Sequence, residues 1–450
     1  MVSSLLVCYG PTALIYYFHP RTSATNCARL YHLSFSNKID PPGDWAFRFS
    51  VTTEQVWDAF VILALLEDHQ KESKVFVVPH TGAQKDRFTD ALRARNLRFR
   101  LHGQPELRHC CNKCLRIYPD GKKVWVVVID GVTIGCPCCS IHNCKIPLEN
   151  NRHRYCPKHA HHNKICSVVG CDSPIATGSL MCSEPAHQEV ERVHQERGQA
   201  RFQLKERLQR AFVAHPNDAI AEETSTDIAD VEDEVEEFEI GGSKLKGKKE
   251  RIRAQLGRRR THNEQIIVAP CGIIIARETF YGAEGVGSVI VCQRPNHEPS
   301  CVLTMAQEMI KRTFHEGIKP DHIFFDNNCT LANMVRDGKD PFFDDIGLTV
   351  DVFHFKSKHS ETDLFCQQNC NPAAYPELIS DDNKGGWYFN SSIAEQTNVW
   401  LGGYHAICRE MLVDKYTFFL DEMILHRNRM TREKLTKEGR APRNWIYHVQ

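Results

Sequence analysis

The chain has 450 residues, of which 42% are apolar, and its 56 Lys and Arg balance 56 Asp and Glu. This length predicts two or three domains, and the zero net charge excludes attraction of the whole molecule to nucleic acid, so such binding must use local patches. No apolar run is long enough to span a bilayer, and no basic stretch opens a signal peptide, so no membrane contact is expected. The 20 cysteines gather near histidines, which indicates an intracellular zinc protein.

Residues 1–108 are expected to form a small mixed α/β domain. The spacing of apolar residues predicts helices at 56–66 and 86–99, and residues 74–80 read as a short strand that Pro79 ends. Nothing in this region has catalytic spacing.

Residues 139–187 contain the same arrangement of ligands twice. The pattern Cys-x4-Cys-x11-Cys-x2-His is followed by Cys-x4-Cys-x10-Cys-x4-His, and the segment CSIHNC in the first copy corresponds to CSVVGC in the second. Three thiolates and one imidazole close a tetrahedral shell around structural zinc, whereas the alternative is buried reduced thiols. The expected ligands are Cys139, Cys144, Cys156 and His159 in the first copy, and Cys166, Cys171, Cys182 and His187 in the second.

A third zinc half-site lies upstream. Cys111 and Cys114 form a Cys-x2-Cys pair beside His109 and Cys110, and Cys136 and Cys138, which follow the strand-like residues 122–131, could complete it. Adjacent cysteines at 110/111 and 138/139 leave the pairing open. Residues 109–190 are poor in Leu and Ile, so we expect metal to supply their folding free energy and chelation to unfold them.

Residues 191–262 are expected to be a charged helix and a disordered linker. Residues 222–239 hold ten Asp or Glu and no Lys or Arg, whereas residues 243–260 hold nine Lys or Arg and one Glu. Such blocks bury too little apolar surface to repay the entropy of ordering. The basic half could bind phosphates or a nuclear-import receptor, and the acidic half could cover it until DNA competes. The alternative is that the segment is only a soluble tether.

A second core is expected over residues 263–430, followed by a tail at 431–450. The pattern predicts a mixed sheet covered by helices. Its expected strands are 265–270, 272–282, 288–293, 322–326 and 348–355, and its expected helices are 301–314 and 391–426.

Two carboxylates of this core stand where a metal site could form. Asp326 ends the strand 322–326, and Glu395 lies in the first turn of the last helix. Such a pair could hold magnesium or manganese for phosphodiester chemistry, although most carboxylates are simply surface residues. Between them lies a further candidate zinc set, for which buried thiols and a hydrogen-bonded histidine are the alternative. Its members are His354, His359, Cys366 and Cys370.

Long stretches of the chain resemble one family. FDNNC, VDVFHFKSKHSETDLFCQQNC and WYFNSSIAEQTNVW are similar to proteins associated with the KDZ (Kyakuja-Dileera-Zisupton) transposases. VIDGVTIGCPCCSIHNCKIPL and YCPKH resemble the CxC cysteine cluster that accompanies them, and WAFRFSVT, VPHTGAQKDRF and GQPELRHCCNKC resemble a second CxC-type domain. The resemblance implies a mobile-element-derived protein of a kind abundant in fungal genomes. It also implies an α/β (α+β) fold, with an RNase H-like transposase core in the C-terminal half, preceded by the zinc module and the N-terminal domain.

The resemblance further implies a triad of an Asp on the first strand, an Asp in Asp-x2-Cys and a Glu followed by Trp. Asp326 with Cys329 matches the second member, and Glu395 with Trp400 resembles the third. If residues 264–278 are the first strand, no carboxylate lies between the two terminal glutamates, and Cys271 or a neighbour takes the place of the Asp. Glu284 or Asp351 could substitute; otherwise the missing charge would impair cleavage.

We therefore expect a nuclear, zinc-stabilised, transposase-related protein that binds DNA. Magnesium- or manganese-dependent strand cleavage of the DDE type would be intact or degenerate. The alternative is a non-catalytic zinc-finger scaffold that acts with a protein partner such as an active transposase. The second cysteine copy favours the alternative, because it has no Lys or Arg between Cys166 and His187.

Overall fold

The computed structural model describes residues 22–33, 51–78, 86–141, 143–214, 236–240, 250–261, 263–281, 302–315, 319–358, 362–381 and 386–444. The chain forms two compact units: a sheet unit of residues 1–135 and 262–450, and a cluster unit of residues 136–261. Residues 109–135 thus belong with the C-terminal half, so the domain boundary expected at 108/109 differs from the one observed. The strand expected at 288–293 lies outside the described residues.

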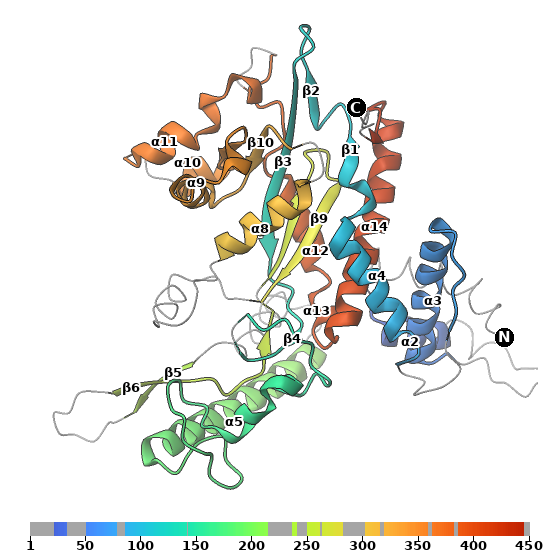
Figure 1. The fold of residues 1–450 in the computed structure, drawn as a ribbon. Coiled ribbons are helices and arrows are strands. Elements are labelled where there is room, and N and C mark those ends of the chain that lie inside the picture. The colour runs from blue at the N-terminus through green and yellow to red at the C-terminus, as the bar shows by residue number, and fades with distance from the viewer. Residues whose placement is uncertain are drawn as a thin grey trace, which may run out of the picture. The chain divides into compact units, whose positions relative to one another are not determined.

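The sheet unit is built around β3, whose residues 124–129 are all buried. A strand covered on both faces needs a continuous apolar run, and VWVVVI supplies it. The sheet order is β11-β10-β3-β8-β9, with β10 and β11 parallel to β3, and with β8 antiparallel to both β3 and β9. Strands β3, β9 and β10 of this sheet are labelled in Figure 1. Strand β2 pairs with the start of β3. The strands are β2 (Leu115–Ile117), β3 (Lys123–Val132), β8 (Asn263–Val268), β9 (Ile274–Phe280), β10 (His322–Phe324) and β11 (Gly347–Thr349).

Alternate side chains of β3 enter different layers. Trp125, Val127 and Ile129 join the core that α8 (Val302–Phe314) and α9 (Asn328–Asp337) help to form. Helix α12 (Ile393–Gly402) packs on β3 and β8. Because successive side chains of a strand point to opposite faces, Asp130 shares its face with Val126 and Val128.

The C-terminal elements are shorter than predicted. The helix expected at 391–426 is three helices, α12, α13 (His405–Cys408) and α14 (Val413–Lys437). The strand expected at 348–355 ends at Thr349, and α10 (Val352–Lys358) follows. Asp351 causes this change of direction, because its Oδ1 accepts the backbone N–H groups of Phe353 and His354 at 2.9 and 3.1 Å and so caps the new helix. Smaller elements are α11 (Leu364–Asn369), η6 (Pro341–Phe343), η7 (Pro372–Ala374) and η8 (Pro376–Leu378).

The described part of residues 1–108 is helical. It comprises α2 (Ala24–Tyr31), α3 (Thr53–Lys71), α4 (Thr89–His102) and η3 (Pro105–Arg108). Thr52 and Gln55 form a capping box that starts α3. Helix α4 packs on α14, where the buried side chains of Arg95 and Glu422 form an ion pair. The strand expected at 74–80 is absent over residues 74–78. Strand β1 (His109–Cys110) follows η3 and pairs with β12 (Arg443–Asn444).

The cluster unit contains the cysteine repeat, α5 and two short sheets. Strands β4 and β7 pair at the two ends of the unit. The expectation of a wholly disordered linker is wrong for β5 and β6, which pair antiparallel and bury Phe238 and Ile252 against Cys166 and Cys182. Residues 215–235 and 241–249 lie outside the described ranges. The elements are β4 (Pro137–Cys138), η4 (Pro157–Lys164), α5 (Pro185–Ala214), β5 (Glu236–Ile240), β6 (Glu250–Ala254) and β7 (Arg259–Arg260).

Over the described ranges, none of the helices has the length and apolar composition needed to cross a membrane.

Candidate metal centres and carboxylate site

The first copy of the repeat converges on one point. Nδ1 of His159 lies 3.5 Å from the sulfurs of Cys139 and Cys144 and 3.3 Å from that of Cys156, and the Cys144 and Cys156 sulfurs are 3.9 Å apart. Tetrahedral zinc with three thiolates and one imidazole requires sulfur–sulfur distances of about 3.8 Å and sulfur–nitrogen distances of about 3.6 Å. Pro157 starts the short helix η4, whose first turn brings His159 next to Cys156. These four residues therefore fit structural zinc, as the spacing predicted.

The second copy has the same geometry. The Cys166 and Cys182 sulfurs lie 3.6 and 3.2 Å from Nδ1 of His187, and the Cys171 and Cys182 sulfurs are 3.9 Å apart. His187 stands in the first turn of α5, so this zinc site joins the repeat to the long helix. Cys166 and Cys182 are also buried in the core with β5 and β6. This group fits zinc as well.

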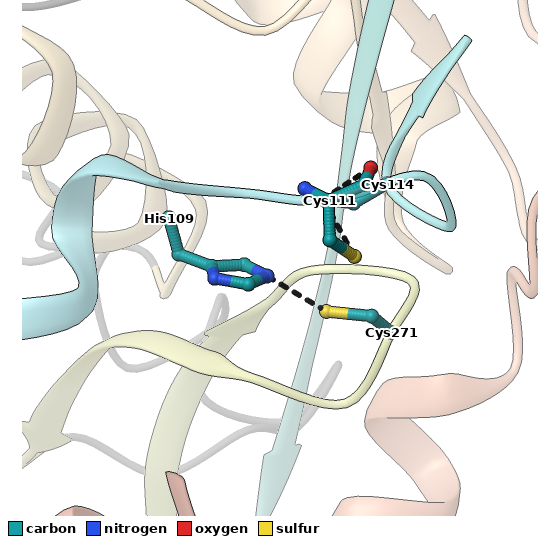
Figure 2. A group of neighbouring side chains, drawn as sticks. All are labelled: His109, Cys111, Cys114 and Cys271. Atoms are coloured by element: carbon teal, nitrogen blue, oxygen red, sulfur yellow. Dashed lines mark hydrogen bonds between the residues drawn. The ribbon is translucent and has the colours of Figure 1, made fainter. Parts of the chain in front are cut away.

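A third group forms in the sheet unit, with ligands that the sequence did not pair. His109, Cys111, Cys114 and Cys271 lie within 4.8 Å of one another. The Cys111 and Cys114 sulfurs are 3.6 Å apart, and Cys271 Sγ is 3.2 Å from His109 Nε2 (Figure 2). Cys271 reaches the group from the tight turn between β8 and β9, where Gly272 has a φ of 95°. The group fits a zinc site of one imidazole and three thiolates.

The predicted use of Cys136 and Cys138 in this third site is wrong. Cys138 lies on β4 and Cys136 just before it, in the cluster unit, and the backbone of Cys136 is bonded to Thr261. Cys271 was missed because it stands 157 positions after Cys114 with no other cysteine near it in the sequence. The one available signal was a cysteine at the tip of a Pro-Cys-Gly turn between two predicted strands.

The thiols of the third group influence one another. The pKa of Cys111 is lowered, because the thiols of Cys114 and Cys271 hydrogen-bond to it, whereas the pKa of Cys114 is raised by the same contact. Burial raises the pKa of Cys271. The site thus favours a thiolate at Cys111, the form in which cysteine binds zinc.

The fourth predicted zinc set is not formed as a unit. His354 lies beside Asp326 and Asp351, away from the sulfur cluster, and His359 lies outside the described residues. Cys366 Sγ is instead 2.8 Å from Cys329 Sγ, and the Cys329 thiol also hydrogen-bonds to Cys370. Cys329, the cysteine of the Asp-x2-Cys motif, therefore lies beside Cys366 and Cys370, which the sequence spacing did not predict.

Three aspartates lie at the same register on or just after three neighbouring parallel strands. Val128 of β3 is paired with Phe324 of β10, which is paired in turn with Thr349 of β11. Asp130, Asp326 and Asp351 each follow by two residues. Neighbouring strands are about 4.8 Å apart, so the register brings these carboxylates to one edge of the sheet.

Residues 264–278, which were expected to hold the first strand of the triad, do not lie beside β10. Strands β8 and β9 occupy this segment, and neither pairs with β10. The parallel partner of β10 is β3, which carries Asp130. Asp130 was missed because residues 122–131 were assigned to the zinc region. The signal was present in the sequence, since VVVID, HIFFD and GLTVD are three apolar runs that each end in Asp.

Asp130 is held in place and electrostatically coupled to the two predicted carboxylates. Its Oδ1 accepts the N–H of Gly131 at 2.7 Å, and its Oδ2 accepts the side-chain amide of Asn398 on α12 at 2.8 Å. Burial, and to a lesser degree the negative charges of Asp326 and Glu395, raise the pKa of Asp130 to about 6. Glu395 stands exposed in the first turn of α12. Both predicted carboxylates, Asp326 and Glu395, are thus close enough to Asp130 for their charges to act on it.

His354 and Asp351 extend this carboxylate site. His354 Nδ1 is 3.0 Å from Asp326 Oδ1 and 3.2 Å from Asp351 Oδ1. The pKa of Asp351 is lowered, because hydrogen bonds from Ser391, the backbone and Ser392 outweigh the opposing effect of burial. These three residues form the fourth group that could hold an ion among the described residues.

The thiolate groups define the class of the molecule, a zinc-binding cysteine-cluster protein with a mixed α/β fold. The family model described as "CxC6 like cysteine cluster associated with KDZ transposases" matches residues 128–193. The match begins on β3 and contains both copies of the repeat, so the chain carries a cysteine cluster of the KDZ transposase-associated kind, and the resemblance is confirmed over these residues. No curated protein and no solved structure matches the chain.

Proposed function

We propose that this transposase-related protein cleaves DNA strands with divalent ions held by Asp130, Asp326 and Glu395. The observation that carries the proposal is the register of β3 and β10, which puts Asp130 beside Asp326 on the face against which α12 packs. Sequence reasoning left cleavage in doubt because the first-strand carboxylate was missing. Asp130, on the strand that pairs with β10, is the carboxylate we propose for that place.

The sheet supports an RNase H-like core. Three antiparallel strands, β3-β8-β9, lie beside two strands parallel to the first, β10 and β11, an arrangement expected of that fold. The cluster unit is an insertion between β3 and β8. Because of this insertion, the sheet begins earlier in the chain than residue 263, where the second core was predicted to start.

The donor set of oxygens suits magnesium or manganese. A pair of such ions, when bound, activates an attacking water and stabilises the leaving oxygen of a phosphodiester. Gly131 and Asn398 fix the orientation of Asp130. Glu395 remains exposed, which leaves it accessible to a phosphate on the surface. The mutual repulsion of the carboxylates raises their affinity for cations.

The test is nicking of supercoiled plasmid by the zinc-loaded full-length chain in magnesium or manganese. Asp130→Asn, Asp326→Asn and Glu395→Gln should each reduce the rate by about 100-fold or more, because several kcal/mol of transition-state stabilisation depend on the bound ions. Asp345→Asn, an exposed aspartate of the same unit, is the matched control. Nicking that persists in Asp130→Asn would refute the assigned role.

DNA binding by the cluster unit is the second part of the proposal. Exposed basic side chains gather in the first copy and its link to the second: Lys145, Arg152, Lys158 and Lys164. Part of the predicted basic linker has a structural role instead, since Arg258 donates to the carbonyl of Asn151 at 2.7 Å and Arg154 donates to that of Gln255. We further propose that the protein acts on nuclear DNA.

The scaffold function rests on the second copy, which offers no basic side chain between its ligands. A pulldown with the full chain after nuclease treatment separates the two functions. Retention of an active transposase would favour the scaffold, and recovery of DNA fragments without a protein partner would count against it.

A further inference from the structure

We propose that Asp326, Asp351 and His354 bind a divalent transition-metal ion of the manganese or zinc type. The role of this ion in cleavage rests on the function proposed above, whereas its binding does not. Asp326 would then be shared, with one oxygen on this ion and the other available to an ion held with Asp130 and Glu395.

The backbone brings the three ligands together from different elements. Asp326 and Asp351 follow adjacent parallel strands at the same register, and His354 stands in the first turn of α10. Their ligand atoms lie within 4.8 Å of one another, with His354 Nδ1 at 3.0 and 3.2 Å from the two carboxylates. Both complete zinc groups of the cluster unit also use Nδ1 of their histidine.

His354 indicates a ligand beyond the carboxylates themselves. The residue is only 9% exposed, and its Nδ1 is buried without a hydrogen bond of acceptable geometry, despite the short distances to both oxygens. A protonated histidine that merely paired with the aspartates would point its N–H at one of them. A nitrogen that points at neither oxygen while lying near both is suited to a common third partner, a cation.

The surroundings keep Asp351 oriented as a ligand. Its Oδ1 accepts two backbone N–H groups of α10, and its Oδ2 accepts the hydroxyl of Ser392 at 3.2 Å. Such outer contacts fix ligand carboxylates in metal sites. Ser392 is the residue before α12, so the same aspartate also holds the helix that carries Glu395.

The ligand chemistry selects the ion. Magnesium prefers oxygen ligands and keeps most of its water, whereas an imidazole beside two carboxylates suits manganese, zinc or iron. We therefore expect the site to bind manganese more tightly than magnesium.

Electron spin echo spectroscopy of bound manganese tests this directly. The zinc-loaded full-length protein is passed over a chelating resin to remove loosely bound ions and is then given one equivalent of Mn²⁺. Modulation from a directly bound ¹⁴N is expected in the unaltered protein, which makes the result independent of whether any variant folds. Its absence would overturn the proposal.

Variants identify the nitrogen. In His354→Gln the ¹⁴N modulation should vanish and Mn²⁺ should bind at least about tenfold more weakly, whereas His315→Gln, at an exposed histidine of the same unit, should match the unaltered protein. Modulation that persists in His354→Gln would assign the signal elsewhere and refute the site. In Asp130→Asn the signal should remain while nicking is lost. Retained signal in a protein that never nicks DNA would reject the cleavage function alone, and nicking without a ¹⁴N signal would reject this site alone.

Discussion

Replacing Asp130 by asparagine should stabilise the sheet unit at neutral pH while removing the proposed activity. Burial and two neighbouring negative charges raise the pKa of Asp130 from 3.8 to about 6 in the folded protein. Its protonated form is therefore the one that the fold favours. Stability from this group is fully present below pH 3.8, falls as the pH rises through about 6, and stays low above it.

The magnitude follows from that shift. The difference between 3.8 and about 6 corresponds to about 3 kcal/mol, an upper bound for the cost of the charged form. Asp130 is partly exposed, so solvent screening reduces this to about 1–2 kcal/mol. Asparagine removes the charge, and a flip of the Asn398 amide would let its Oδ1, now without a hydrogen bond, accept from the new side chain.

Hydrogen exchange of peptides covering β3 and β8 measures the effect in zinc-loaded protein without magnesium or manganese. Protection of Asp130→Asn should exceed that of the unaltered chain at pH 8, and the difference should fall to about half at pH 5, where Asp130 is protonated in the folded chain but still ionised in the unfolded chain. Saturating manganese should reverse the order at pH 8, because only the unaltered chain retains the full carboxylate set. A variant less protected at pH 8 in the absence of these ions would refute the reasoning.

Three further outcomes are expected. Cys271→Ser should lose one zinc ion per chain in a mercurial release assay, whereas Cys136→Ser should keep the full number; the reverse result would restore the ligand set predicted from local spacing. Arg95→Ala should cost about 3–5 kcal/mol in urea denaturation, because it removes the cation that pairs with the buried Glu422, and Arg93→Ala, on an exposed pair of the same helix, should cost less than about 1 kcal/mol. DNA affinity should fall roughly 100-fold between 50 and 200 mM salt if four basic side chains of the cluster unit contact phosphates; an affinity unchanged by salt would exclude these contacts.

Local patterns predicted the local features of this molecule. Helices α3, α4 and α8 were foreseen from apolar spacing and α5 from its charged residues, and both zinc groups of the repeat were foreseen because all four ligands of each lie within 22 residues. Within so short a segment, few other cysteines or histidines are available as zinc ligands. The helix boundaries after residue 391 were missed, since Gly402 and Gly403 end α12 within a stretch whose apolar spacing reads as one helix.

Long-range pairing could not be predicted in the same way. Strand β3 pairs with β8 across an inserted unit and with β10 almost 200 positions later, and an apolar run alone does not specify its partner. The same limit applies to Cys271, which reaches its group from a distant turn. The first error assigned Asp130 to the zinc region, and the second left Cys271 out of its ligand group.

The way in which the cluster unit closes on itself bears on how the chain folds. The two ends of the unit are tied by the pairing of β4 with β7 and by reciprocal backbone and side-chain bonds between Cys136 and Thr261 at 2.9 and 3.0 Å. Closing an unstructured loop of this length between β3 and β8 would cost roughly 3 kcal/mol more than closing a four-residue hairpin. A unit already folded around zinc removes most of that difference, because it presents its ends close together. During synthesis, early zinc capture would thus prepare β3 to meet its partner as soon as β8 is made.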